Sequence, residues 1–212
     1  MSMKPNIVYT LLEPSRTMLE SLSLLRPSTL EPTHDPKMIM VIPGFMATDQ
    51  STVALRRGLD DMGHYVTGWD EGLNTGLDDE KLIRIAEQVR AMDDGFILIG
   101  HSLGGIYARQ IAKMCPNVSK VICICSPVNL NAADAMTAIE VIYRKINSAS
   151  ARTIKEVSQA PLCESIHLFS KTDGVLHWAA CQQPAGVNIE IKGSHCGAVL
   201  NRKVIDLIGN MV

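Results

Sequence analysis

A serine flanked by glycines is the clearest chemical signal in this sequence. Gly100-His-Ser-Leu-Gly104 matches the pattern Gly-x-Ser-x-Gly, in which the serine lies on a strained turn between a strand and a helix. The aliphatic run 96–99 precedes the motif, and apolar residues at helical spacing follow it. Glycines on both sides of the turn remove side chains that would clash and leave the hydroxyl exposed. Ser102 is therefore predicted to be a nucleophile, with an idle serine in a Gly-rich turn as the alternative.

A serine hydroxyl needs a positioned base, and the sequence offers six histidines. His195 is the predicted base, because it follows the last strand-like run on a loop flanked by Gly193 and Gly197. His177 is the rival, because it also lies in a loop after a strand. Of the others, His34 lies in a Pro-rich connector and His64 precedes a weak strand. His101 lies beside the nucleophile, and His167 lies inside a strand.

The base in turn needs a carboxylate that fixes its tautomer and stabilises its cation. Asp173 comes shortly after the strand-like run 166–169, although an Asp-Gly pair is also common in plain surface turns. With Asp173 as the acid, the chain order is nucleophile, acid, base, as expected for a serine on such a turn. Asp70 and Asp134 are the alternative acids.

Acyl transfer also needs hydrogen-bond donors aimed at the oxyanion. One is predicted to be the backbone N–H of Leu103, the residue after the nucleophile. The second should come from the loop after the first strand-like run, where we predict the N–H of Phe45, with Met46 as the alternative. Candidates for lining the substrate pocket, with core packing as the alternative, are Gly44, Phe45, Met46, Trp69 and Trp178.

Short aliphatic runs and apolar residues at helical spacing alternate from Met38 onward. This alternation predicts an α/β fold of three layers, α/β/α, around a mainly parallel sheet of about six strands. Ligands bind beyond the carboxyl ends of the strands in such sheets, which is where the predicted catalytic residues fall. The predicted strands span 38–42, 64–69, 96–99, 121–125, 166–169 and 187–191, and the predicted helices 78–92, 103–111 and 204–208.

Residues 1–37 differ from the rest of the chain. They contain a predicted helix, Ser15–Leu25, and then a connector that three prolines interrupt. We predict an N-terminal arm that packs on an α/β domain of residues 38–212, with a flexible tail as the alternative. Residues 129–160 are predicted to form one or two helices across the mouth of the site. The segment is too short for a large lid, so we expect little or no cap.

Composition excludes several function classes. The net charge is −2 with no charged block, so neither nucleic acid nor anionic lipid is indicated as a partner. No apolar run approaches the ~20 residues that a membrane span needs. The N-terminus lacks the features of a signal peptide, so a cytoplasmic location is expected. The sequence does not indicate an oligomeric state.

The six cysteines follow neither a disulfide framework nor the spacing of metal ligands. No metal or organic cofactor is therefore predicted. Cys181 and Cys196 flank the loops of the predicted acid and base, and we expect them to lie near each other without a bond.

Four segments together resemble the lipase and esterase branch of the α/β-hydrolase superfamily. They are Pro43-Gly44-Phe45, Gly100-His-Ser-Leu-Gly104, Asp173-Gly174 and Gly193-Ser-His195. Segments 42–52 and 170–181 look like those of small bacterial members, and the resemblance covers residues 38–212. It implies the same triad and the same oxyanion pair. Pro43 departs from the His that many relatives have there, but a backbone donor should survive this change.

The expected activity is the hydrolysis of carboxylic esters through an acyl-enzyme on Ser102, in the manner of an esterase or lipase. The expected substrate is a small-molecule or lipid-like ester. Thioesterases, acyltransferases and lyases use the same residues, so the sequence does not separate these reactions. A non-catalytic protein that binds a ligand or partner in the pocket is the alternative of a different class.

Overall fold

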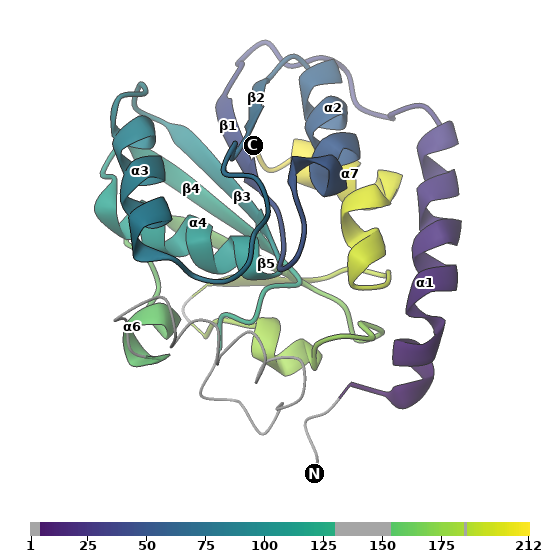
Figure 1. The fold of residues 1–212 in the computed structure, drawn as a ribbon. Coiled ribbons are helices and arrows are strands. Elements are labelled where there is room, and N and C mark those ends of the chain that lie inside the picture. The colour runs from purple at the N-terminus through teal and green to yellow at the C-terminus, as the bar shows by residue number, and fades with distance from the viewer. Residues whose placement is uncertain (1–4, 130–153, 185) are drawn as a thin grey trace.

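The computed structural model describes residues 5–129, 154–184 and 186–212. These residues form one sheet of six strands in the order β2-β1-β3-β4-β5-β6, and all neighbouring strands are parallel (Figure 1). The predicted α/β fold with a mainly parallel sheet is therefore confirmed. The strands are β1 (Met38–Ile42), β2 (Tyr65–Gly68), β3 (Phe96–His101), β4 (Val118–Ile124), β5 (Glu164–Phe169) and β6 (Val187–Glu190).

The strand order reverses once, beside β1. The chain passes from β1 to β2 at the edge, returns to β3 on the other side of β1, and continues outward through β4, β5 and β6. Open α/β sheets bind ligands at such a switch point, outside the carboxyl ends of the strands. The predicted oxyanion loop follows β1 and the predicted nucleophile follows β3, so the topology brings these two segments together.

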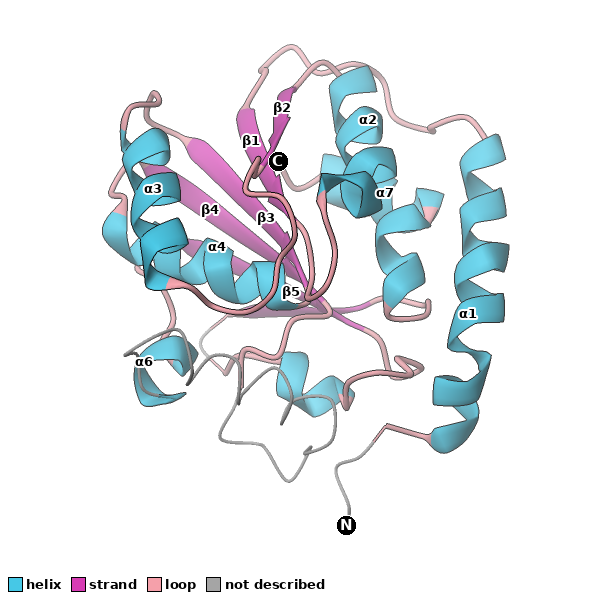
Figure 2. Ribbon diagram, in the orientation of Figure 1, coloured by secondary structure: helices cyan, strands magenta, loops and turns pink. Residues whose placement is uncertain are grey.

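Helices cover both faces of the sheet. Figure 2 shows α3 and α4 on one face and α2 and α7 on the other. Ile39 and Val41 of β1 enter the core under α2 and α7, whereas Met40 and Ile42 enter the opposite core. Because both faces of the central strands are buried, these strands consist of unbroken aliphatic runs. The covering helices are α2 (Val53–Asp61), α3 (Asp79–Arg90), α4 (Leu103–Met114) and α7 (Arg202–Gly209), and shorter ones are η2 (Asp49–Thr52), α6 (Ile154–Ser158), η4 (Trp178–Cys181) and η5 (Cys196–Leu200).

The N-terminal helix is longer than predicted. Helix α1 spans Ile7–Ser21 and continues as the 3-10 helix η1 (Leu22–Leu25), with Pro14 inside α1. A proline inside a helix removes one backbone hydrogen bond and costs ~3 kcal/mol, so the sequence predicted a start after it. Contacts outside the helix offset this cost, because α1 packs alongside η5 (Figure 1).

The two sides of α1 are the reverse of an ordinary amphipathic helix. Its outward side carries exposed apolar residues, whereas the buried residue of α1 is Glu13. The exposed apolar side chains of α1 are Ile7, Val8, Leu11, Leu12, Met18 and Leu19.

No helix among the described residues is long and apolar enough to cross a membrane.

Candidate active site

Ser102 lies on a strained turn between β3 and α4. Its φ of 52° and ψ of −121° are unusual for a residue with a side chain, and such backbone strain costs about 1–3 kcal/mol. The Ser102 N–H donates to the carbonyl of Ile124 at 2.8 Å, which anchors the turn to β4. A Cβ on Gly104 would lie 2.2 Å from the Ile42 carbonyl oxygen, so only glycine allows α4 to approach β1 this closely.

Strain is concentrated at the carboxyl edge of the sheet. Among the described residues, those other than glycine with positive φ are Met46, Asp70, Ser102 and Cys125. They follow β1, β2, β3 and β4 respectively, close to the end of each strand. Such strain gathers at functional sites, where the surrounding structure must maintain it. This edge is therefore the candidate active site.

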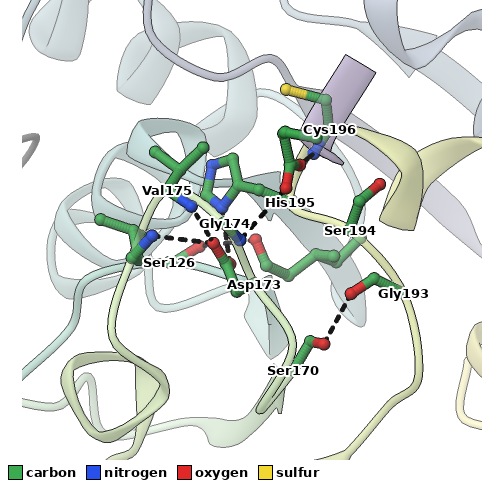
Figure 3. Close-up of polar contacts among 12 residues, drawn as sticks. Ser126, Ser170, Asp173, Gly174, Val175, Gly193, Ser194, His195 and Cys196 are labelled. Atoms are coloured by element: carbon green, nitrogen blue, oxygen red, sulfur yellow. Dashed lines mark hydrogen bonds and ion pairs between the residues drawn. The ribbon is translucent and has the colours of Figure 1, made fainter. Parts of the chain in front are cut away.

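Asp173 and His195 form a buried hydrogen-bonded pair at this edge. His195 Nδ1 lies 2.7 Å from Asp173 Oδ2 (Figure 3). The other oxygen, Oδ1, accepts hydrogen bonds of 2.8 Å from the N–H groups of Val175 and Leu176. Since Nδ1 donates to the carboxylate, Nε2 is the nitrogen left to act as a base. The arrangement is that of an acid which orients a histidine.

The two members of the pair stabilise each other's charge. Burial lowers the pKa of His195, but the nearby carboxylates of Asp173 and Glu13 outweigh burial and hold that pKa above its ordinary value. For Asp173, burial raises the pKa, but the charge and hydrogen bond of His195 bring it below the ordinary value. The pair is therefore suited to hold a proton transiently on the imidazole.

A cavity of about 310 Å³ opens at these residues, and both Ser102 and His195 line it. Ser102 Oγ and the His195 ring share no hydrogen bond in the described part of the chain, and such bonds often tighten only when substrate binds. The lining residues are Thr17, Gly44, Phe45, Ala47, Gln50, Ser51, His101, Ser102, His195, Cys196, Val199 and Leu200.

The two predicted oxyanion donors are free to serve. The N–H groups of Phe45 and Leu103 have no hydrogen-bond partner among the residues that the structure describes. Leu103 is the first residue of α4, where N–H groups have no partner within the helix. The alternative donor, Met46, is wrong, because its N–H donates to the Asn74 carbonyl at 2.7 Å.

Two of the predicted pocket residues lie elsewhere. Gly44 lines the cavity beside Ser102, but Met46 does not, and this residue is 60% exposed. Trp178 packs on Phe169, with ring centroids 5.9 Å apart, and borders a separate cavity with Asp173. Trp69, the further candidate, is fully buried in the core.

The structure also shows where the alternative base, His177, and one alternative acid, Asp70, lie. His177 accepts a hydrogen bond from the Ala179 N–H at the start of η4 and borders the same separate cavity as Trp178. Asp70 is exposed after β2. Asp134 and the predicted cap within residues 130–153 lie outside the described residues. Cys181 is buried and Cys196 exposed, and both thiols are free.

Cys125 adds a thiol to the buried pair. A sulfur, a carboxylate oxygen and a ring nitrogen from Cys125, Asp173 and His195 lie within 4.8 Å of one another, and these are metal-ligand types. However, burial and the charge of Asp173 raise the pKa of Cys125 well above the ordinary value, and a metal binds the thiolate. Both carboxylate oxygens of Asp173 are also engaged. The three groups therefore suit a neutral thiol beside a charged pair better than a cation site.

Three residues of the site were missed from the sequence. His101 Nε2 lies 3.0 Å from the His195 carbonyl oxygen, and Asn74 is fully buried against the predicted oxyanion loop. Glu13 of α1 accepts hydrogen bonds from the loops of both Asp173 and His195. For Glu13 a signal existed, since Thr10, Glu13, Thr17 and Glu20 recur at helical spacing beside the apolar residues Leu11, Leu12, Met18 and Leu19.

The six-stranded parallel sheet with helices on both faces is an α/β-hydrolase-like fold. The family model of the PGAP1-like alpha/beta domain matches residues 80–188, just over half of the 212 residues. The chain belongs to the family of PGAP1-like alpha/beta domains. The matched range contains Ser102 and Asp173 and ends before His195.

Solved structures share the fold at low sequence identity. A pyrethroid hydrolase from Sphingobium faniae is 14% identical, with a TM-score of 0.62 over 84% of this chain and 97% of that one. The lipase BlEst2 from Bacillus licheniformis is 12% identical, with a TM-score of 0.62 over 86% and 94%. The esterase domain of a Rhodothermus marinus protein is 17% identical, with a TM-score of 0.56 over 85% and 89%. No curated protein sequence matches this chain significantly.

Proposed function

We propose that the protein is a serine hydrolase that cleaves carboxylic esters, with Ser102, His195 and Asp173 as its catalytic residues. The observation that carries this proposal is the buried hydrogen bond of 2.7 Å between Asp173 and His195, beside a cavity that Ser102 also lines. The strained turn at Ser102 supports the proposal, since backbone strain of this kind is found mainly at functional sites. The structural neighbours support the ester class, because their names include a lipase and an esterase domain.

Acylation is the first step. Ser102 Oγ attacks the ester carbonyl carbon, and His195 Nε2 accepts the hydroxyl proton as the new C–O bond forms. The carbonyl π electrons move onto the oxygen, which becomes an oxyanion. The N–H groups of Phe45 and Leu103 donate to it. Asp173 stabilises the imidazolium and does not itself take the proton.

The tetrahedral intermediate then collapses. The bond to the alkoxy oxygen breaks, and His195 gives its proton to the departing alcohol. The acyl group remains on Ser102. A water molecule gives its proton to His195 as it attacks this acyl-enzyme. The bond to Ser102 Oγ then breaks, and His195 returns the proton to that oxygen as the acid leaves. No step needs a redox partner.

The cavity limits the substrate. About 310 Å³ lies at the small end of the range for ligand pockets, which spans about 300–1,000 Å³. Its lining includes apolar side chains such as Phe45, Val199 and Leu200. A short acyl or alcohol group fits this space, so we expect short-chain esters to be preferred.

Turnover of a panel of p-nitrophenyl esters tests the proposal. Acetate and butyrate esters should be hydrolysed faster than the palmitate, and Ser102→Ala should abolish turnover. Ser119→Ala is the matched control, because Ser119 is an exposed serine on β4 and should leave the rates unchanged. Wild-type rates in Ser102→Ala would overturn the proposed nucleophile. Turnover of thioesters alone, or acyl transfer to an alcohol in preference to water, would assign the alternative reactions of the same residues.

A further inference from the structure

Polar side chains of α1 form hydrogen bonds with the loops of the proposed acid and base. Thr10 Oγ1 donates to the Gly174 carbonyl at 2.6 Å, and Arg16 Nη2 donates to Thr172 Oγ1 at 2.8 Å. Both partners lie in the loop that carries Asp173. These contacts join segments more than 150 residues apart in the chain. Helix α1 is therefore attached to the site by specific bonds.

Glu13 bridges the two loops with one carboxylate. Its Oε2 accepts from the Gly174 N–H at 3.1 Å, and its Oε1 accepts from the Cys196 N–H at 2.9 Å. These two N–H groups belong to the residues directly after Asp173 and His195. A single carboxylate is thus hydrogen-bonded to the backbones of both loops. Glu13 is 8% exposed, and it does not line the cavity.

Glu20 makes a second set of contacts, about two turns further along α1. Its two oxygens accept from the N–H and the hydroxyl of Ser194, both at 2.7 Å. Ser194 directly precedes His195. The base is therefore held on both sides in the chain, by Glu20 before it and by Glu13 after it. Thr17 lies between these two and contacts Ser194 Oγ at 3.2 Å.

The loops are shaped to receive these carboxylates. A Cβ on Gly174 would lie 2.5 Å from Glu13 Oε2, and a Cβ on Gly197 would lie 1.7 Å from Glu20 Oε2. A side chain at Gly174 would also clash with the Tyr9 carbonyl oxygen of α1, 2.5 Å away, and one at Gly197 would displace the Glu20 carboxylate. The absence of a side chain at both positions is a second observation, independent of the hydrogen bonds, that α1 and the catalytic loops fit each other.

We propose that Glu13 is a positioning residue of the active site, which holds the loops of Asp173 and His195 at the separation that catalysis needs, with Glu20 as its partner on α1. This inference rests on the proposed hydrolase function. It makes the N-terminal helix part of the catalytic machinery, although α1 comes before the first strand of the sheet. It also gives the imidazolium of His195 a second nearby carboxylate.

The charge of Glu13 gives the proposal a readout beyond stability. Together with Asp173, it favours the protonated form of His195. Removing this charge should lower the pKa of His195 and move the acid limb of the pH profile to lower pH. The other titratable groups that face Glu13 and His195 are Asp173, His101, Cys125, Cys196 and Glu20.

The test compares Glu13→Gln and Glu13→Asp with the wild type in p-nitrophenyl butyrate hydrolysis. Gln lacks the charge and has one acceptor oxygen for two N–H groups, so kcat should fall about tenfold to a hundredfold, as expected for misplaced catalytic groups. KM should change little, because Glu13 is outside the cavity. Asp keeps the charge but is one methylene shorter. It should keep the acid limb near the wild-type position while kcat still falls.

Controls separate this inference from the proposed function. Glu31→Gln is the matched variant, because Glu31 is exposed in the connector, and it should behave as wild type. Thermal unfolding shows which variants are folded at the assay temperature. If Glu13→Gln does not fold, Glu13→Asp and Glu20→Gln carry the test. An active wild type whose folded Glu13 and Glu20 variants keep full kcat overturns the positioning role, whereas an inactive wild type overturns the hydrolase function instead.

Discussion

The ring of His101 is hydrogen-bonded to the backbone of His195, with Nε2 3.0 Å from the carbonyl oxygen. This bond links the turn of the nucleophile to the loop of the base. Burial and the charge of His195 lower the pKa of His101 to about 3, so its ring stays neutral and Nε2–H donates. We therefore propose that His101 positions His195, the proposed base, and is not itself a base.

His101→Phe should separate these two loops. The variant keeps a ring but removes the donor, and it leaves a buried carbonyl without a partner at a cost of about 1–3 kcal/mol. We expect a lower melting temperature and a lower kcat. His101→Gln is the matched rescue, because its amide nitrogen lies near the position of Nε2. Equal stability and activity of His101→Phe and the wild type would contradict this role.

Asn74 should control the oxyanion loop. Its side-chain Nδ2 donates to the Pro43 carbonyl at 2.8 Å, and its backbone carbonyl accepts from the Met46 N–H at 2.7 Å. The loop that carries Phe45 is therefore held from both sides. Asn74→Asp has the same shape but faces the Pro43 carbonyl with an oxygen, so the two groups repel.

For Asn74→Asp we expect kcat to fall up to about a hundredfold, because oxyanion donors act mainly in the transition state. KM should change less. Asn188→Asp is the control, since Asn188 is exposed on β6. Steady-state kinetics on a short ester measure both constants. A rise in KM at unchanged kcat would show that Asn74 serves ground-state binding instead.

The pH dependence follows from the Asp173–His195 pair. The base must be neutral to accept a proton, and its pKa lies above the ordinary 6.5. The kcat/KM value should therefore rise with pH through a midpoint above that of a free histidine. Asp173→Asn should cut kcat by about four orders of magnitude, because the histidine loses its tautomer. Its residual activity should show a lower midpoint.

The same shifts give signs for stability. The raised pKa of His195 means that its protonation favours the folded state, and this contribution is lost as pH rises through the folded-state value. The lowered pKa of Asp173 stabilises the fold above the unfolded value, and this contribution is lost as pH falls through the folded one. The free energy of unfolding of the wild type, measured with denaturant from acid pH to above the pKa of His195, should show both losses. In Asp173→Asn both losses should be smaller.

The sheet could be predicted from the sequence because its strands are continuous aliphatic runs. The predicted range 38–42 is β1 itself, and the loops after β3, β5 and β6 carry Ser102, Asp173 and His195. Helix α2 escaped prediction because only its Leu55, Gly58 and Leu59 are buried, among charged neighbours. Local patterns reveal an element only when enough of it faces the core.

The contacts that hold the site could not be predicted in this way. Glu13 meets residues 161 and 183 positions away, and no local pattern encodes such pairs. Pro14 hid the first half of α1. Trp178 follows the acid loop in sequence, but its ring packs on Phe169, which only tertiary structure decides. The proposed function thus depends also on residues that carry no motif.

The site of covalent labelling by a fluorophosphonate probe tests directly whether Ser102 is the nucleophile. The phosphorus of the probe is attacked by an activated serine, with fluoride as the leaving group. Intact mass should increase by one adduct, and peptide mapping should place that adduct on Ser102. Labelling should require pH values at which His195 is neutral, and Ser102→Ala should not label. A folded wild type that stays unlabelled from about pH 6 to 9, a range around the ordinary histidine pKa, would contradict the proposed role of Ser102 as the nucleophile. An adduct on any other residue would contradict it as well.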